Sequence, residues 1–75
     1  MAKTPRPTGK EMVRFLEQQG FTVVRVRGSH YFLEQADRRT SVPVHGHRAL
    51  KMGTLRSILR DIGMSPAEFQ GLWSS

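Results

Sequence analysis

The sequence predicts an α+β fold in which a three-stranded antiparallel sheet carries two helices on one face, followed by a short C-terminal helix. Two observations lead to this prediction. Apolar residues recur at helical spacing near both ends of the chain, whereas the stretch between them alternates apolar and polar residues and is interrupted by turn signals. Because three strands with one apolar face cannot bury that face alone, the helices must cover it, in the order α-β-β-β-α.

The first helix is predicted for residues 9–19. Thr8 and Glu11 have the spacing of a capping box, and Gly20 is a residue type at which helices commonly end. The residues before it, 1–7, contain proline, lysine and arginine, and we expect them to form a flexible basic arm.

A second helix is predicted to end at Gly63, because four apolar residues before it follow the i, i+3, i+4, i+7 pattern. These residues are Leu55, Ile58, Leu59 and Ile62. Ser65 stands three residues before Glu68 and so repeats the capping-box spacing, which predicts the start of the short third helix.

Three strands are predicted, at residues 21–27, 30–34 and 40–44. Gly28 and Ser29 form a two-residue turn signal, so the first two strands are expected to make a hairpin. Pro43 cannot donate a hydrogen bond to a neighbouring strand, which places the third strand at an edge of the sheet.

The hairpin turn also predicts the register, because a two-residue turn sets Arg27 opposite His30. The same turn is expected to pair Val26 with Tyr31, Arg25 with Phe32 and Val24 with Leu33. A second turn, of two residues at Asp37-Arg38 or of four from Ala36 to Arg39, is expected to pair Leu33 with Val42, Tyr31 with Val44 and His30 with His45. The face toward the helices is then formed by Val24, Val26, Tyr31 and Leu33, and the open face by Arg25, Arg27, His30, Phe32 and Glu34. This register predicts a row of Arg27, His30 and His45 across the three strands, about 5 Å apart.

Composition limits the partner and the compartment. The 75 residues hold 12 Lys+Arg against 6 Asp+Glu, a formal charge of +6 with a pI near 11.2, which favours a polyanion such as RNA. No apolar run is long enough to span a membrane, and the first residues lack the apolar stretch of a signal peptide, so we expect a cytoplasmic protein. With no cysteine, disulfides and thiol catalysis are excluded. Residues 8–75 are expected to form a single domain.

The chemistry that the predicted row favours is RNA cleavage without a metal. A neutral imidazole at His30 is suited to removing the proton of a ribose 2′-hydroxyl, and the permanently charged Arg27 is suited to holding phosphate oxygens. DNA lacks that hydroxyl and cannot react in this way. The alternative is that His30 is merely the first strand residue after a turn, exposed and without a function.

Other candidate groups are weaker. His45 is more simply explained as a structural residue, although an accessory role stays open. His45 and His47 have a metal-ligand spacing, but no third ligand lies near them in the sequence, so no metal site is expected. Ser29 belongs to a turn and has no adjacent acid and base to make it a nucleophile.

Four segments of the chain, taken together, resemble the HicA toxin family. They are Gly20-Phe21, Arg27-Gly28-Ser29-His30, Val42-Pro43-Val44-His45 and the run from Gly53 to Leu59, and the resemblance covers about residues 8–64. It implies a fold like that of double-stranded-RNA-binding domains, a metal-independent mRNA interferase activity that needs no cofactor, a catalytic histidine at His30 and a HicB antitoxin as partner.

The chain departs from the family pattern at two places. The second turn lacks a glycine after Asp37, which concerns only the loop length. Tyr31 stands where a second histidine is common, which argues against a two-histidine mechanism here.

The sequence therefore predicts a toxin endoribonuclease that cleaves mRNA with His30 as general acid/base. The expected RNA contacts are Arg25, Arg27, Gly28, Ser29 and Lys51. The alternatives are a non-catalytic RNA-binding module, with Phe32 stacking on a base, and a pure interaction protein whose charge pairs with an acidic partner.

Overall fold

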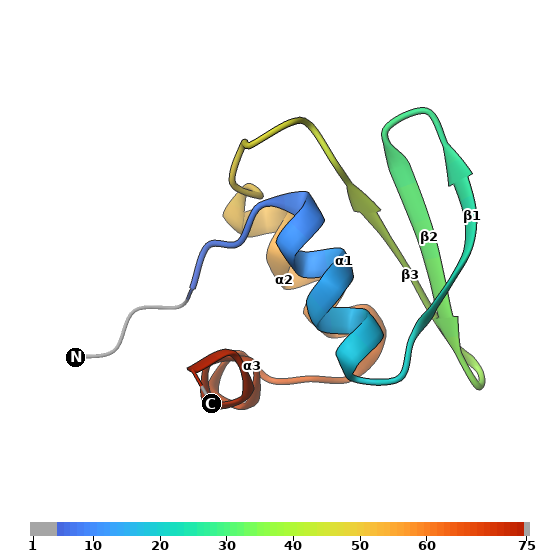
Figure 1. The fold of residues 1–75 in the computed structure, drawn as a ribbon. Coiled ribbons are helices and arrows are strands. Elements are labelled where there is room, and N and C mark those ends of the chain that lie inside the picture. The colour runs from blue at the N-terminus through green and yellow to red at the C-terminus, as the bar shows by residue number, and fades with distance from the viewer. Residues whose placement is uncertain (1–4, 75) are drawn as a thin grey trace.

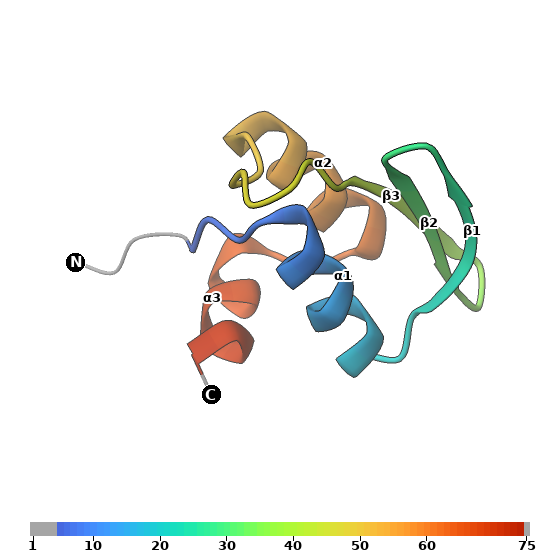
Figure 2. The same ribbon diagram turned by 45° about the horizontal axis from the view of Figure 1, so that its top comes forward.

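The computed structural model describes residues 5–74 as a helix, three strands and two further helices (Figure 1). They are α1 (Gly9–Gln18), β1 (Thr22–Arg27), β2 (His30–Gln35), β3 (Arg38–Pro43), α2 (Met52–Ile62) and α3 (Pro66–Ser74). α1 and α2 lie on one side of the sheet, and α3 lies beyond them, away from the strands (Figure 2). This arrangement confirms the predicted α+β fold. None of the helices in this part of the chain is long and apolar enough to cross a membrane.

The start of α1 is capped as predicted. The Glu11 N–H donates to Thr8 Oγ1 at 3.1 Å, and the Thr8 N–H donates to Glu11 Oε1 at 2.9 Å. This reciprocal pair satisfies two backbone donors that the first turn leaves free. The helix then turns its apolar face inward and ends at Gln18, and Gly20 follows with a φ of 101°.

The segment before α1 is attached to the domain at its end. The Leu50 N–H donates to the carbonyl of the buried Pro7 at 2.8 Å, and Arg6 Nη2 donates to the Leu50 carbonyl at 3.4 Å. Residues 1–4 of the predicted arm lie outside the described residues. The division into an arm and a domain at residue 8 stays a prediction.

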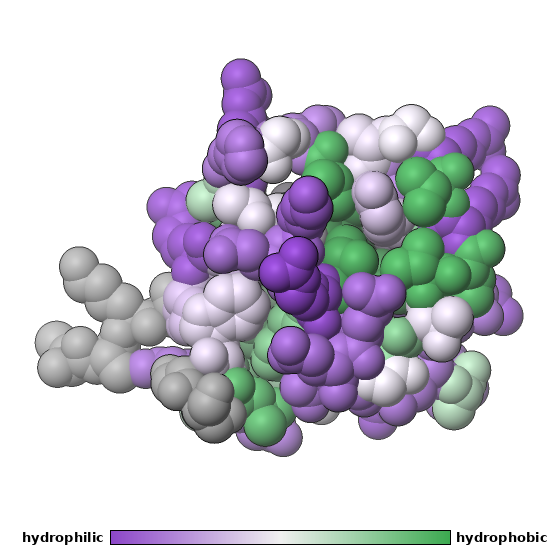
Figure 3. Space-filling model, in the orientation of Figure 1, coloured by the Kyte–Doolittle hydropathy of each residue, from purple (hydrophilic) through white to green (hydrophobic). Residues whose placement is uncertain are grey.

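The first hairpin has the predicted turn but contains one irregularity. Arg27 pairs with His30 and Val26 pairs with Tyr31, yet a β-bulge at Val24 brings Val23, not Val24, opposite Leu33. The prediction that Val24 faces the core is therefore wrong, because a bulge adds one residue to one strand and reverses the alternation beyond it. Val24 and Val26 are 51% and 53% exposed, and Figure 3 shows hydrophobic surface over this region.

The register of the second hairpin differs from the prediction by two residues. The turn consists of Ala36 and Asp37, with Ala36 at a φ of 56°. The observed pairs are Leu33 with Thr40, Tyr31 with Val42 and His30 with Pro43, so the predicted pairs of these residues with Val42, Val44 and His45 are wrong. Because the shift is even, β2 and β3 keep their predicted faces, but β3 ends at Pro43 and His45 lies outside the sheet.

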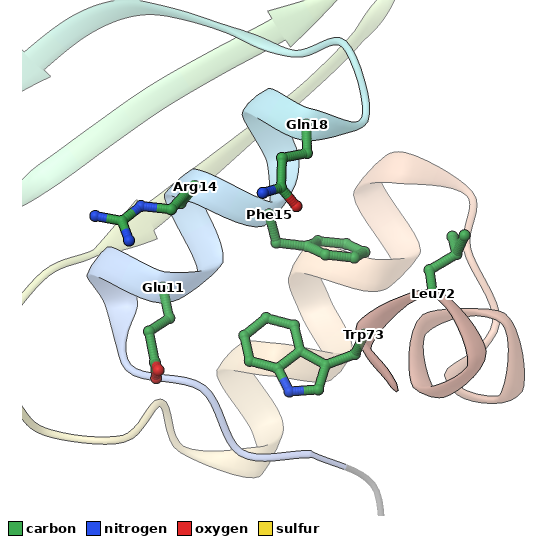
Figure 4. Close-up of a pocket in the computed structure, with 6 residues that line it drawn as sticks. All are labelled: Glu11, Arg14, Phe15, Gln18, Leu72 and Trp73. Atoms are coloured by element: carbon green, nitrogen blue, oxygen red, sulfur yellow. The ribbon is translucent and has the colours of Figure 1, made fainter. Parts of the chain in front are cut away.

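The core lies between the sheet and the helices, and α3 closes its far end. Phe69 of α3 is fully buried, and its ring meets the ring of Phe15 edge-on, with centroids 5.1 Å apart. Trp73 lies against both rings, with centroids 5.7 Å from Phe15 and 5.5 Å from Phe69. Figure 4 shows Trp73 and Phe15 converging on the hollow between α3 and α1. The third helix therefore supplies an aromatic layer that the thin core of such a small domain needs.

Two side chains of β3 tie the sheet to α2. Thr40 Oγ1 donates to Asp61 Oδ2 at 3.0 Å, and Arg38 Nη1 donates to the carbonyl of Ile62 at 2.6 Å. At the other end of β3, α1 begins so close to the strand that a Cβ at Gly9 would meet the backbone of Pro43. The helices are thus held at both ends of β3.

Candidate active site

His30 is the first residue of β2 and lies directly after the Gly28-Ser29 turn. Tyr31 and Leu33 point toward the core, so the alternation of the strand sends the exposed His30 side chain to the opposite, open face. The turn is held from outside the hairpin, because the Val44 N–H donates to the Ser29 carbonyl at 2.7 Å. Gly28 adopts a φ of 60°, a conformation that favours glycine. The local fold therefore places the imidazole at the tip of a fixed hairpin.

The imidazole borders a shallow cleft of about 400 Å³, which we call the His30 cleft. It lies where the open face of the sheet passes the edge of β3 and meets α2. Its lining residues are His30, Ser41, Pro43, Gly53, Thr54, Ser57, Ile58 and Asp61. Hydroxyl groups make most of this wall polar and can donate hydrogen bonds to a phosphodiester or its ribose, whereas the one carboxylate, Asp61, accepts a hydrogen bond from Thr40.

One end of the cleft is formed by the start of α2. Lys51 is the N-cap residue and provides no side-chain cap, so the first-turn N–H groups near Gly53 and Thr54 are left without that partner. Such groups carry the positive end of the helix dipole and favour an anion. The Lys51 side chain is exposed at the same point and adds a full positive charge. The geometry favours a phosphate between the start of α2 and His30.

Two further cations stand on the sheet beside His30. Arg27 lies opposite His30 on β1, and Arg25 lies opposite Phe32, with its guanidinium carbon 5.9 Å from the centroid of the Phe32 ring. Both arginines are exposed. The structure thus places Arg25, Arg27 and His30 on the open face as predicted, and a cation stacked on an aromatic ring is a surface that nucleic acids can contact.

His45 does not complete the predicted row. The residue opposite His30 on β3 is Pro43, and His45 lies two residues beyond the end of the strand. The exposed His45 side chain lines a neighbouring hollow together with Arg48 and Lys51, and this hollow shares Pro43 and Thr54 with the His30 cleft. The predicted row is therefore wrong in its third member, although His45 remains at the rim of the site.

The segment that contains the site residues matches the model of a known protein family. A family model described as the HicA toxin of bacterial toxin–antitoxin systems matches residues 9–64, well over half of the chain. The chain belongs to the HicA toxin family. The match runs from α1 to just after α2 and so includes all residues of the His30 cleft, whereas α3 follows it. Among curated proteins, none matches the chain significantly.

Membership of the HicA family confirms the resemblance seen in the sequence. Family membership implies that the chain is a toxin with endoribonuclease activity, that its substrate is RNA and that its partner is an antitoxin protein.

In this HicA-family toxin, the α2 wall of the cleft was not predicted from the sequence. Thr54, Ser57 and Asp61 stand at i, i+3 and i+7 on α2, next to its buried apolar face. This polar stripe was a signal in the sequence, but only the packing of α2 along β3 shows that it faces His30. Asp61 also accepts the Thr40 hydrogen bond, so its carboxylate is held in place.

The described residues contain no cluster of three or more His, Cys, Asp or Glu side chains that could hold a metal ion. His45 and His47, the pair with ligand spacing in the sequence, are both exposed in the segment between β3 and α2.

Proposed function

We propose that this toxin is an mRNA interferase in which His30 is the general acid/base and no metal takes part. The observation that carries the proposal is the position of His30. Its imidazole stands exposed at the border of a polar cleft, with Arg27 opposite it on β1 and the start of α2 at one end. Family membership supports endoribonuclease activity, and the geometry supports the choice of residue.

The reaction would begin with removal of a proton from a ribose 2′-hydroxyl by the neutral imidazole of His30. The 2′-oxygen attacks the adjacent phosphorus, and the bond between the phosphorus and the 5′-oxygen breaks. The products are a 2′,3′-cyclic phosphate and a 5′-hydroxyl. The proton held by His30 returns to the leaving 5′-oxygen, directly or through water, so the histidine ends in its starting form.

Negative charge grows on the phosphate oxygens during this step, and fixed positive groups lower the barrier by binding that charge. Arg27 is suited to this role because its guanidinium offers paired donors to two oxygens. On the other side, the first turn of α2 borders the cleft, and Lys51 lines the neighbouring hollow, which shares Pro43 and Thr54 with the cleft. If a phosphate were held between these groups, the 2′-hydroxyl of the adjacent ribose would lie next to His30.

The remaining RNA contacts follow the open face. We propose that Arg25 and Arg27 bind successive phosphates of the RNA. The small residues of the Gly28-Ser29 turn would let the RNA backbone come close to the protein backbone, and Phe32 would offer a ring on which a base stacks. Stacking would compete with the Arg25 guanidinium that now lies over the ring.

A single histidine is sufficient for this scheme. Tyr31, which occupies the place of a second histidine in the family pattern, lies on the opposite face and packs against the core. It therefore cannot share a substrate with His30. Serine is also an unsuitable nucleophile here, because the substrate supplies its own in the 2′-hydroxyl.

The antitoxin partner that family membership implies is proposed to be of the HicB type and to keep RNA away from His30. An exposed imidazole at the border of an open cleft is accessible to RNA, so inhibition requires that RNA be kept from the cleft or from the cations beside it. A standard interface of about 1,600 Å² in total would be large enough to do so.

The test of the proposal is a cleavage assay with matched RNA substrates in excess chelator. One substrate is an RNA oligonucleotide that the toxin cuts, and the other carries a single 2′-deoxynucleotide on the 5′ side of the cut bond. We expect cleavage of the first to a 2′,3′-cyclic phosphate and no cleavage of the second. Cleavage of the deoxy substrate, or loss of activity in chelator, would contradict the mechanism.

A non-catalytic RNA-binding module remains the second candidate, and one observation favours it. Within residues 5–74 no hydrogen bond orients the His30 imidazole, whereas most catalytic histidines are held by a second group. In the proposed enzyme the bound phosphate must provide this orientation. Tight binding of RNA without any cleavage would support the module.

A further inference from the structure

A second surface of the toxin lies on the other side of the sheet from His30, between α1 and β1. It is a groove of about 660 Å³, which we call the α1–β1 groove. Its floor is apolar, with Val13, Val23, Tyr31 and Val44. Its rim is lined by Lys10, Arg14, Glu17, Gly46 and His47. RNA is a poor occupant, because the floor offers one aromatic ring, Tyr31, where a stacking platform needs several, and the cations of the rim stand beside the acidic Glu17.

The strand beside this groove is an unpaired edge. β1 is one of the two edge strands, with β2 as its neighbour, and it exposes Val24 and Val26. Val26 pairs with Tyr31 and so lies on the same face of the sheet as the groove. Figure 3 shows hydrophobic surface here, with hydrophilic surface around it. An edge strand with exposed valines is a template for the addition of another strand, unless charges prevent it.

The charged side chains of β1 determine which kind of strand can pair with it. Arg25 and Arg27 alternate with the valines and point to the open face. A second copy of this chain pairing through β1 would bring these arginines against one another, and like charges facing across strands are destabilising. The net charge of +6 on each copy acts in the same direction. A strand with acidic side chains opposite Arg25 and Arg27, and apolar ones on the groove side, fits both faces.

We propose that the antitoxin binds by adding such a strand to β1, with apolar side chains in the α1–β1 groove and acidic side chains against Arg25 and Arg27. This partner deepens the proposed function, because it names how the same site is inhibited. The added strand neutralises the arginines beside His30 and leaves them unable to bind phosphate. His30 borders the cleft and Tyr31 lines the groove; the two residues are adjacent on β2 and point to opposite faces, so β2 contributes to both sites.

The first measurement is hydrogen exchange of the unmodified toxin with and without its purified antitoxin. Strand addition predicts slowed exchange of amides in β1 and unchanged exchange in α3, which lies away from the sheet. Unchanged exchange in β1 would overturn the proposal. Because this readout needs no RNA, it is independent of whether His30 catalyses cleavage.

The second measurement is the affinity of the antitoxin for toxin variants by titration calorimetry. Val26→Lys places a charge on the groove side of β1 and should weaken binding at least about 30-fold, the effect of losing a hot-spot residue. Leu72→Lys is the matched control, because Leu72 is a 43% exposed residue of α3, and its affinity should stay within about threefold of the parent. Equal losses in both variants, or none in Val26→Lys, would refute the proposal.

Sedimentation of the toxin alone and an RNA-binding assay test the two other possible occupants of the groove, a second copy of the chain and RNA. A concentration-dependent dimer that Val26→Lys abolishes would identify a second copy as the occupant and overturn the proposal. If Val26→Lys weakens RNA binding and leaves antitoxin binding intact, RNA is identified as the occupant and the proposal is likewise overturned. A monomer whose RNA binding survives the substitution agrees with the antitoxin.

Discussion

Replacing His30 with alanine should separate activity from stability. The side chain is exposed, lies on the open face and has no hydrogen bond within residues 5–74, so its removal should change the free energy of unfolding by no more than about 0.5 kcal/mol. Loss of a positioned acid/base group lowers a rate by about 10²- to 10⁴-fold, or roughly 3 to 5 kcal/mol in the barrier. The His30→Ala variant should therefore melt with the parent and fail to cleave RNA.

The neighbouring residue provides the control. Tyr31→Ala removes a ring that packs against the core, but the ring is only partly buried because it also lines the α1–β1 groove. The cost should be about 2 to 3 kcal/mol, somewhat below that of a fully buried aromatic residue. For a domain of this size, that lowers the melting temperature by roughly 10 °C or more. Activity below the melt should be retained.

Thermal melts and the chelator-treated cleavage assay on both variants decide the matter, with the cleavage measured at a temperature at which both are folded. The reasoning is refuted if His30→Ala melts as early as Tyr31→Ala, or if it cleaves at the parent rate. In the second case the RNA-binding module becomes the better account of the cleft.

The remaining predictions concern stability and binding. Ala36→Gly should raise the free energy of unfolding by roughly 0.5 to 1 kcal/mol, because Ala36 is held at a φ of 56° that favours glycine. Ala67→Gly in α3 should lower it by a similar amount, because glycine is less favourable than alanine in a helix, and chemical denaturation measures both changes. Phe69→Ala should destabilise by about 3 to 5 kcal/mol, since the ring is fully buried against Phe15, and an unchanged melt would show that α3 is dispensable. The logarithm of RNA affinity should fall with log salt by about 0.7 per neutralised phosphate; Arg27→Gln should reduce the slope by one such step and Arg60→Gln should leave it unchanged.

Most of the fold could be predicted because its signals are local. The capping box at Thr8 and the turn at Gly28 each depend on a few neighbouring residues whose chemistry permits little else. The second turn was predicted, but its exact residues were not, because the positive φ belongs to Ala36, a residue type that gives no turn signal. The bulge at Val24 was equally hidden, since the flanking valines and arginines fit either register and only packing against distant residues such as those of α1 decides between them.

The candidate site could be predicted only in part, for a related reason. His30 and the two arginines of β1 follow from the hairpin register, which is local. The α2 wall of the cleft and the displacement of His45 depend on contacts between segments far apart in the chain, such as Thr40 with Asp61. No pattern within one segment specifies such contacts.

The close approach of α1 to the end of β3 has a consequence for genetic screens. Gly9 carries no chemistry and lies on a different element from His30, yet any side chain at position 9 would press on the backbone of Pro43, the residue that pairs with His30 and lines its cleft. A library of random variants selected for survival of the host should therefore return substitutions at Gly9 beside those at His30. Mapped on the sequence alone, the two positions would look unrelated.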